Sequence, residues 1–376
     1  MQSLQTNTKA GRGRARRAAA AALAAVGCAG IAATAAFAGS TTPSQMLTQY
    51  LAKPTSIGNF APLKSAPPKG KVVVFLATGE VSNVQVANGV AQAAKAAGWK
   101  YYSASYNAAD PASMSAALDI AIAKHANYVM EAGTPLFPSF TSAASAHHIK
   151  IAVDAVDPVD VTGPVIDSSG GAPVDYRMGV LTADEFIVNS HSKGVAVEEA
   201  IPQYPILTTF AHGFQNTVKS ECPACKIIPA DVSLTDFAAG KLDSDVITVV
   251  KANPSAKYLV FDDGPFADGI TSALSAQGIS GIKVLGEAGD AAGFAALKTG
   301  ANLSWTGYSV PFDSWEMMDA AFRNAEGMKV PSADASQPTQ IVTEANASSI
   351  TLYPTIGGWN YPTNGFAQFE KVWQLG

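Results

Sequence analysis

The chain has 376 residues, of which 48% are hydrophobic and 15% charged, and a net charge of −5. This length is sufficient for two domains of ordinary size with a large core, and the composition is that of a globular protein. Beyond the N-terminus the basic residues form no stripe, which argues against a nucleic-acid partner.

The first 38 residues have the features of a secretory signal peptide. Lys9 and four arginines precede an Ala-rich run over residues 18–38, and Ala36-Phe37-Ala38 matches a cleavage site. The alternative is a membrane-spanning helix, since the run is nearly long enough to cross. Residues 25–28 also resemble a bacterial lipobox, which would make Cys28 a lipid anchor and the only contact with the membrane. We therefore expect an exported protein, extracellular or bound to the cell envelope.

A tether over residues 39–70, rich in Pro, Ser and Lys and containing one short helix around Gln45–Leu51, is predicted to precede the first domain. From Lys71 onward, continuous apolar runs are typical of strands buried on both faces. Four such strands are expected at residues 72–76, 101–104, 128–130 and 149–153, alternating with helices at 84–97, from Asp110-Pro111, and at 140–147. This alternation predicts a parallel sheet covered by helices on both sides.

The same alternation continues through the second half of the chain. Helices are expected at residues 176–192, 207–219, 237–252, 265–277 and 291–299, and strands at 195–197, 227–232, 258–261, 282–285 and 303–308. A last helix at 312–326 and a short strand near 341–343 follow. One sheet of that width is disfavoured relative to two lobes. The prediction is an α/β fold with two doubly wound parallel-sheet lobes.

Cys222 and Cys225 form a C-x-x-C pair in the sequence Cys-Pro-Ala-Cys. Such a pair can be a redox centre, half of a zinc site or a disulfide. A second cysteine pair is missing and the five histidines show no ligand spacing, which disfavours zinc. In an oxidising compartment the best interpretation is a local disulfide. We expect no metal and no cofactor.

Sequence motifs for covalent catalysis are absent: there is no G-x-S-x-G, no P-loop and no H-E-x-x-H. Gly79 ends the first strand without a G-x-G-x-x-G, so dinucleotide binding has little support. Asp157 and Asp263 each follow a predicted strand, where ligands bind in open α/β sheets. Either carboxylate could line a cleft, while a solvated loop or a helix cap remains the alternative.

The order of elements resembles that of the type I periplasmic solute-binding proteins of ABC transporters, the group of the ribose-binding protein. The similarity is greatest to the sugar-transporter binding proteins of actinobacteria. The matching stretches are residues 68–71, 204–207 with Gly213-Phe214, 222–226, 253–254 before 258–263, and 369–373. The resemblance implies three crossovers near residues 165–175, 309–312 and 336–342. It also implies a first lobe of residues 71–168 plus 310–338 and a second of 169–309 plus 339–376.

The resemblance further implies ligand-binding positions at the ends of strands. They are Thr78, Glu80, Gly133, Thr134, Asp157, Thr208, Asp263, Glu287, Tyr308 and Ser309. Both arginines of the family pattern are missing, one at Ala155-Val156 and one near Thr208, which argues against ribose or galactose. The implied function is non-enzymatic: capture of a small polar solute, a sugar or a sugar-like molecule, for a membrane permease.

Two other functions are compatible with the same pattern. An exported hydrolase could use Asp157 and Asp263 as paired carboxylates. A sensory domain could bind a ligand and dock on a receptor instead of a permease. Turnover of a bound ligand would favour the hydrolase.

Overall fold

The computed structural model describes residues 42–307, 309–331 and 337–376. The expected signal peptide, the lipobox with Cys28 and the proposed ligand residue Tyr308 lie outside these ranges. In the described part, no helix combines the length and the apolar content that a membrane span requires.

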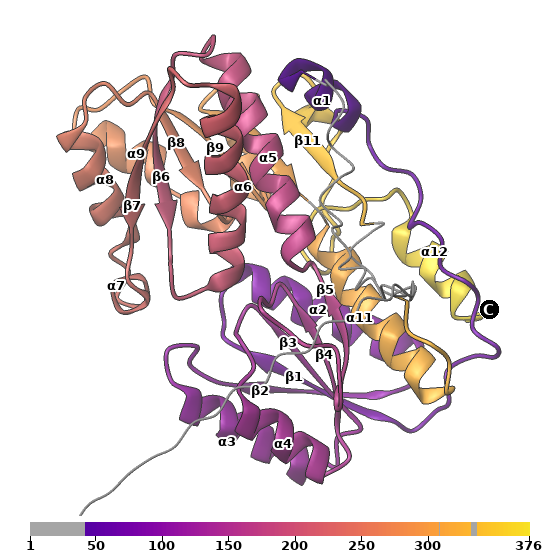
Figure 1. The fold of residues 1–376 in the computed structure, drawn as a ribbon. Helices are drawn as coiled ribbons and strands as arrows, with labels where there is room; N and C mark the ends of the chain where they lie inside the picture. Colours follow the sequence, from indigo (N-terminus) through magenta and orange to yellow (C-terminus); the bar gives the residue numbers. More distant parts are fainter. Residues whose placement is uncertain (1–41, 308, 332–336) are drawn as a thin grey trace, which may run out of the picture. The chain divides into compact units, whose positions relative to one another are not determined.

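The first lobe is built on a five-stranded parallel sheet of order β2-β1-β3-β4-β5 (Figure 1). Its strands are β1 (Val72–Ala77), β2 (Lys100–Ser105), β3 (Tyr128–Ala132), β4 (Lys150–Asp154) and β5 (Val165–Ser169). Alternate residues of β1 face opposite sides of the sheet. Val73 and Phe75 share a core with α2 (Val81–Ala96) and α11 (Val310–Ala325), whereas Val74 and Leu76 share one with α3 (Pro111–Ala123) and α4 (Pro138–Ala146).

The second lobe is built on a six-stranded sheet of order β11-β10-β9-β8-β6-β7. Its strands are β6 (Val195–Ala200), β7 (Lys226–Asp231), β8 (Tyr258–Phe261), β9 (Lys283–Glu287), β10 (Asn302–Gly307) and β11 (Gln340–Thr343). Only β11 runs antiparallel to its neighbour β10 among these pairings in the described residues. Side chains of α5 (Ala172–Asn189) and α6 (Pro205–Glu221) share a core with Val260 and Leu285.

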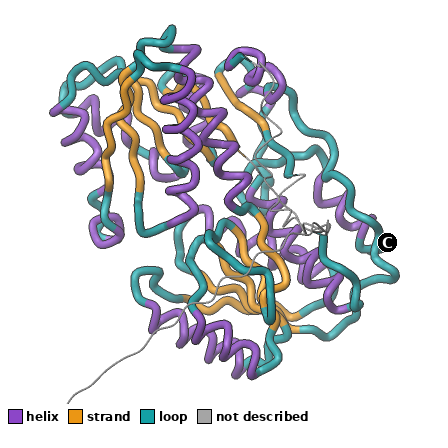
Figure 2. Tube along the Cα trace, in the orientation of Figure 1, coloured by secondary structure: helices purple, strands orange, loops and turns teal. Residues whose placement is uncertain are grey.

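The other face of the second sheet is covered by a further set of helices, as the colouring of Figure 2 shows. They are α8 (Leu242–Ala252), α9 (Ile270–Ala276) and α10 (Ala291–Lys298), whose apolar residues pack with Leu259 and Phe261. The fold is therefore the predicted one, two helix-covered lobes with largely parallel sheets. The chain crosses between them from β5 to α5, from β10 to α11, and from α11 to β11.

Two helices that the sequence pattern joins are interrupted in the structure. The expected helix 237–252 is divided into α7 (Leu234–Ala238) and α8, with Gly240 at φ +69° between them. The expected helix 265–277 begins as the short 3-10 turn η1 (Gly264–Ala267) and resumes as α9 after Gly269 at φ +85°. Glycine adopts this left-handed conformation without the steric cost that other residues carry.

The predicted tether and the predicted end of the second lobe both need correction. Within residues 42–70, α1 (Pro43–Tyr50) packs on α5 and β11, because Leu47 is buried against Leu181 and Ile341. At the other end, β11 belongs to the second sheet as expected, but α12 (Gly365–Val372) packs on α11 of the first lobe. Its Phe369 ring lies 5.3 Å from that of Phe312. Burial of apolar side chains fixes both segments.

The disulfide between Cys222 and Cys225 is present, with a sulfur–sulfur distance of 2.06 Å. It closes the short connection from α6 to β7, so the prediction from the C-x-x-C spacing is confirmed. Cys222 is buried against the core that α6 shares with α5.

Helices α5 and α6 are in backbone contact at two glycines. A Cβ atom on Gly179 would lie 2.1 Å from the carbonyl oxygen of Phe210, and one on Gly213 would lie 2.2 Å from that of Tyr176. Contacts this short cannot be relieved by turning a flexible side chain, because the clashing atoms belong to the backbone. The two glycines therefore set the spacing of the helix pair that carries the second lobe.

Substituting Gly213 by Ala is expected to destabilise the protein by about 1–3 kcal/mol, because the helices must move apart. The better helix propensity of alanine, worth about 1 kcal/mol, would act in the opposite direction. Urea unfolding followed by circular dichroism measures the difference. Asn216→Ala, at an exposed position of the same helix, is the control and should change stability by less than about 0.5 kcal/mol. Equal stability of Gly213→Ala and wild type would contradict the assigned contact.

Candidate ligand-binding site

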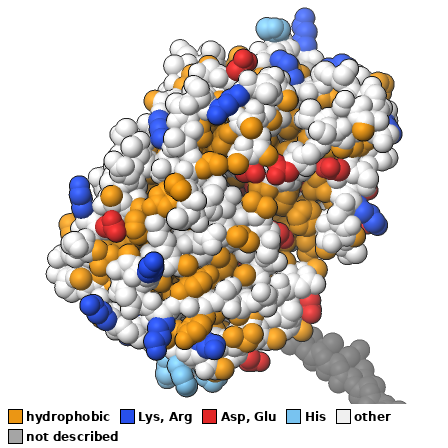
Figure 3. All heavy atoms as spheres, turned by 180° about the vertical axis from the view of Figure 1, so that it is seen from behind, with side chains coloured by type: hydrophobic (Ala, Val, Ile, Leu, Met, Phe, Trp, Pro, Cys, Tyr) orange, Lys and Arg blue, Asp and Glu red, His pale blue; other side chains and the backbone are white. Residues whose placement is uncertain are grey.

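The carboxyl ends of the parallel strands from both sheets meet around one cavity. Its walls come from the segments after β1, β3 and β4 in the first lobe and after β6, β8 and β9 in the second. The hollow measures about 650 Å³, a volume that includes space open to solvent. Ligands of open α/β sheets bind at this edge because the connecting loops leave a crevice there. In the space-filling view, acidic side chains border a hollow on this side of the molecule (Figure 3).

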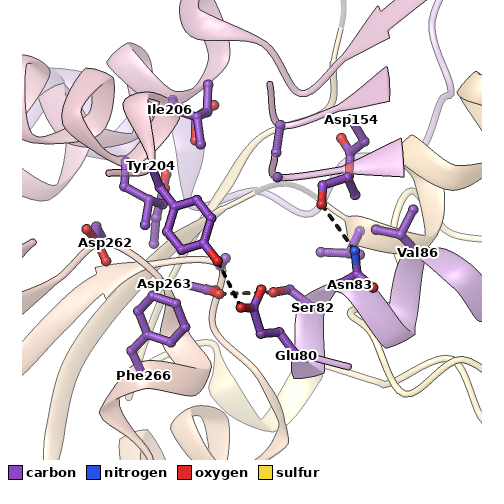
Figure 4. A pocket seen from close by; sticks show the side chains of 18 residues that line it. Glu80, Ser82, Asn83, Val86, Asp154, Tyr204, Ile206, Asp262, Asp263 and Phe266 are labelled. Atoms are coloured by element: carbon purple, nitrogen blue, oxygen red, sulfur yellow. Dashed lines mark hydrogen bonds between the residues drawn. The ribbon is translucent and has the colours of Figure 1, made fainter. Parts of the chain in front are cut away.

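Hydrogen bonds join the two lobes across the cavity (Figure 4). The Ser82 hydroxyl donates to Oδ2 of Asp263 at 3.0 Å, and the Tyr204 hydroxyl donates to Oε1 of Glu80 at 3.0 Å. Outside the cavity wall, the Thr209 hydroxyl donates to Oδ2 of Asp157 at 2.8 Å. Side chains from both lobes therefore lie close enough to contact one small molecule together.

On the first lobe, the segment between β1 and α2 presents Glu80, and Asn83 lies in the first turn of α2. Asn83 holds this segment in place: its Oδ1 accepts from the backbone N–H of Thr78 at 3.1 Å, and its Nδ2 donates to the carbonyl of Ala132 at 3.1 Å. Oε2 of Glu80 accepts from the Thr78 hydroxyl at 3.3 Å. Burial raises the pKa of Glu80, while the hydrogen bonds from Tyr204 and Thr78 lower it.

On the second lobe, Asp262 and Asp263 follow β8, and Glu287 ends β9. Their loops are pressed together at Gly264, where a Cβ would lie 2.5 Å from the carbonyl oxygen of Ala288. Burial raises the pKa of Asp262 to about 7. It also raises the pKa of Asp263 and of Glu287 well above their ordinary values, with nearby carboxylates adding to the effect. Burial therefore favours the protonated form of these acids.

Four of the residues expected from the resemblance line the cavity: Glu80, Gly133, Asp263 and Glu287. Thr78 lines a neighbouring hollow that shares Glu80 and Tyr204 with the first. The Thr134 hydroxyl accepts a hydrogen bond from the hydroxyl of Tyr106 at 2.6 Å, and Thr134 does not line the main cavity.

The remaining expected residues are placed elsewhere. Asp157 and Thr208 are not part of the cavity wall, and Asp157 is bonded to Thr209 instead. Ser309 is buried as the N-cap of α11: its hydroxyl accepts from the N–H of Phe312 at 3.4 Å and donates to the carbonyl of Trp359 at 2.5 Å. This is a structural role that the sequence pattern, with Pro311 at the start of a helix, could have indicated. Tyr308 lies outside the described residues.

The cavity wall also contains residues outside the set of ligand-binding positions that the resemblance implied. They are Ser82, Asn83, Asp154, Asp175, Tyr204, Asp262 and Phe266, together with several apolar residues such as Val86, Ile206 and Val310. Asp262 and Tyr204 lie in stretches that carry the family resemblance, so the sequence did indicate that these stretches are close to a ligand site. Asp175 lies within the first turn of α5, where an acidic side chain commonly interacts favourably with the helix dipole. The local sequence therefore gave no reason to assign it to a ligand site.

Two lobes of this topology, with a ligand cavity between the carboxyl ends of their strands, define the type I periplasmic-binding-protein fold. No protein-family model matches the sequence, and no curated protein sequence matches it. Solved structures do match. A solute-binding protein of an ABC transporter from Mycobacterium smegmatis, crystallised with bound glycerol, is 21% identical with a TM-score of 0.64, over 77% of this chain and 99% of that one.

Two further structures have similar scores. A carbohydrate transporter solute-binding protein from Agrobacterium radiobacter, in complex with D-arabinose, is 18% identical with a TM-score of 0.63, over 74% of this chain and 96% of that one. A putative LacI transcriptional regulator from Bacteroides fragilis is 15% identical with a TM-score of 0.65, over 75% and 99%. At these identities the similarity establishes the fold, which binding proteins and regulators share.

Proposed function

We propose that the chain is the extracytoplasmic solute-binding protein of an ABC importer. It captures a small polar molecule, a sugar or a sugar-like compound, between its lobes and delivers it to a membrane permease. The observation that carries the proposal is the cavity whose wall combines Glu80 and Ser82 of one lobe with Tyr204 and Asp263 of the other. A ligand that contacts both walls stabilises one relative position of the lobes.

Other observations support the parts of this proposal. The N-terminal sequence has the pattern of an export signal, and several of the matching folds belong to ABC transporter binding proteins that hold sugars. The paired-carboxylate hydrolase loses its main support, since Asp157 does not line the cavity with Asp263. In the described residues, no group of three or more His, Cys, Asp or Glu side chains is placed to hold a metal ion. We infer binding without turnover, because the carboxylate pair of the enzyme alternative does not meet in the cavity.

A thermal-shift screen of the purified protein with sugars, polyols and amino sugars tests this function. A true ligand at about a hundred times its dissociation constant should stabilise the protein by about 2.7 kcal/mol. Mass spectrometry of the ligand recovered after long incubation should find it unchanged. Conversion of the ligand would contradict a pure binding function and restore the enzyme alternative, whereas a screen with no stabilising compound would count against sugar-like ligands.

A further inference from the structure

The cavity wall is acidic to a degree that a neutral sugar does not require. Six carboxylic acids line it: Glu80, Asp154, Asp175, Asp262, Asp263 and Glu287. Among the lining residues in the described part of the chain, none is Lys, Arg or His. The acids come from both lobes, so a molecule in the cavity is surrounded by carboxyl groups.

One buried carboxyl oxygen of Asp263 at the wall lies without a hydrogen-bond partner. Asp263 is 7% exposed, and its Oδ1 is unpartnered while its Oδ2 accepts from Ser82. Glu287 is 2% exposed, and its carboxyl group is hydrogen-bonded to that of Asp175. A buried polar atom without a partner costs about 1–3 kcal/mol, so native proteins rarely retain one without a reason. A donor brought by a ligand would satisfy this oxygen of Asp263.

We propose that the natural ligand carries a protonated amine that binds among Asp262, Asp263 and Glu287. This inference rests on the function proposed above and narrows its ligand class from sugar-like molecules to amine-bearing ones, such as amino sugars. An ammonium group supplies three donors and one positive charge. The charge compensates carboxylates that become ionised in a desolvated cavity, which a neutral hydroxyl group cannot do.

The remaining wall groups suit the rest of such a molecule. The aromatic residues Tyr204 and Phe266 line the cavity together with Asp262 and Asp263 (Figure 4). Aromatic faces attract organic cations and also cover the apolar face of a sugar ring. The Ser82 hydroxyl and the Glu80 carboxylate, which now bond to the opposite lobe, can turn to hydroxyl groups of a ligand. The pattern thus favours a hydroxylated amine.

Protonation of the wall should couple to binding. Asp263 is faced by Glu80 and Asp262, with Asp290 nearby, and Glu287 is faced by Asp175, Asp262 and Asp263. Each of these carboxylates raises the pKa of the group that it faces, so an ammonium group that arrives must drive protons off. Affinity for the amine should therefore increase from about pH 5 to about pH 7, as the acids ionise while the amine remains protonated.

The test compares matched ligands by isothermal titration calorimetry of the full chain. Glucosamine is paired with glucose and with N-acetylglucosamine, and putrescine with butanediol. We expect the amine of at least one pair to bind at least about tenfold more tightly than its neutral partners, since charge-assisted hydrogen bonds are roughly twice as strong as neutral ones. Tightest binding by putrescine would support the amine and overturn the sugar-like part of the proposed function.

Three results would overturn the inference. Equal or tighter binding of the neutral sugars would do so while leaving the proposed function intact. Binding of none of these compounds would count against both. Stabilisation by calcium chloride alone, abolished by a chelator, would indicate that the cavity binds a metal ion and not an amine.

Matched variants locate the amine. Asp263→Asn and Glu287→Gln keep the size of the side chain but remove its charge, and each should weaken amine binding by about ten- to a hundredfold. The control is Asp184→Asn, which removes a buried acid of α5 that is not in the cavity wall. A melting curve of each variant without ligand shows whether it folds. If either Asp263→Asn or Glu287→Gln fails to fold, amine binding is measured with the variant that does. Unchanged amine affinity in the folded variants would contradict the assigned position.

Discussion

Raising the pH from about 5 to about 8 is expected to lower the melting temperature of the ligand-free protein by about 5 °C or more, because several buried acids hold protons that the unfolded chain releases. Burial raises the pKa of Glu131 and Glu198 to about 8, and that of Asp184 and Asp262 to about 7. Ordinary values are 3.8 for Asp and 4.5 for Glu. Between these limits the folded protein binds more protons than the unfolded one.

The sign follows from this difference in bound protons. Stability is greatest at a pH below the ordinary carboxyl values, if only these groups are considered, and falls as the pH rises through about 7 and 8. Other paired carboxylates act in the opposite direction at low pH, so the measurement is confined to about pH 5 to 8. Differential scanning calorimetry at constant ionic strength provides it.

The variant Glu198→Gln measures how much this one acid contributes to the decrease of stability with pH. Oε2 of Glu198 accepts from Nε2 of Gln215 at 2.7 Å, and the residue is 2% exposed. Glutamine resembles the protonated acid, so the variant should lose less stability than wild type between about pH 6 and 8. Glu344→Gln, at an exposed position, is the matched control and should keep the wild-type slope. A wild-type melting temperature that rises with pH would contradict the conclusion that these buried acids hold protons in the folded protein.

Replacement of Arg323 by Met is expected to destabilise the protein by about 3–5 kcal/mol, because it leaves a buried carboxylate without its counter-charge. Nε of Arg323 donates to Oδ2 of Asp319 at 2.5 Å, and Nη2 donates to the carbonyl of Ala61 at 2.7 Å. Both side chains of the pair are almost fully buried. The Trp373 indole donates to Oδ1 of the same aspartate at 3.0 Å. The pair thus fastens α11 to the N-terminal segment and to the end of α12.

A double variant separates the lost partner from the lost packing. Asp319→Leu combined with Arg323→Met removes both charges and should be more stable than Arg323→Met alone. Arg323→Lys should restore little, since an ammonium group cannot make the two-pronged contact of a guanidinium. Chemical unfolding in urea measures all three. Stability of Arg323→Met within about 1 kcal/mol of wild type would be incompatible with this arrangement.

The candidate site was only partly predictable from the sequence. The resemblance implied Glu80, Asp263 and Glu287, all of which line the cavity. Asp263 was also indicated by the sequence itself, because it follows an apolar strand at the ligand edge of an α/β sheet. Ser309 has the same sequence context but caps a helix, and Asp157 bonds to Thr209. Whether a strand-end side chain enters the cavity depends on its partners from other elements, which the local sequence does not contain.

The two-lobed α/β architecture and the disulfide were predictable from the sequence pattern, because apolar periodicity and close cysteine spacing are local properties. The packing of distant segments, by contrast, anchors the N-terminal segment on the second lobe through Leu47 and places α12 on the first lobe through Phe369. It also brings six acids from distant segments to one cavity without a basic residue among those lining it in the described ranges. The electrostatics of a buried site depends on distances and desolvation, and both arise when segments far apart in the sequence pack together.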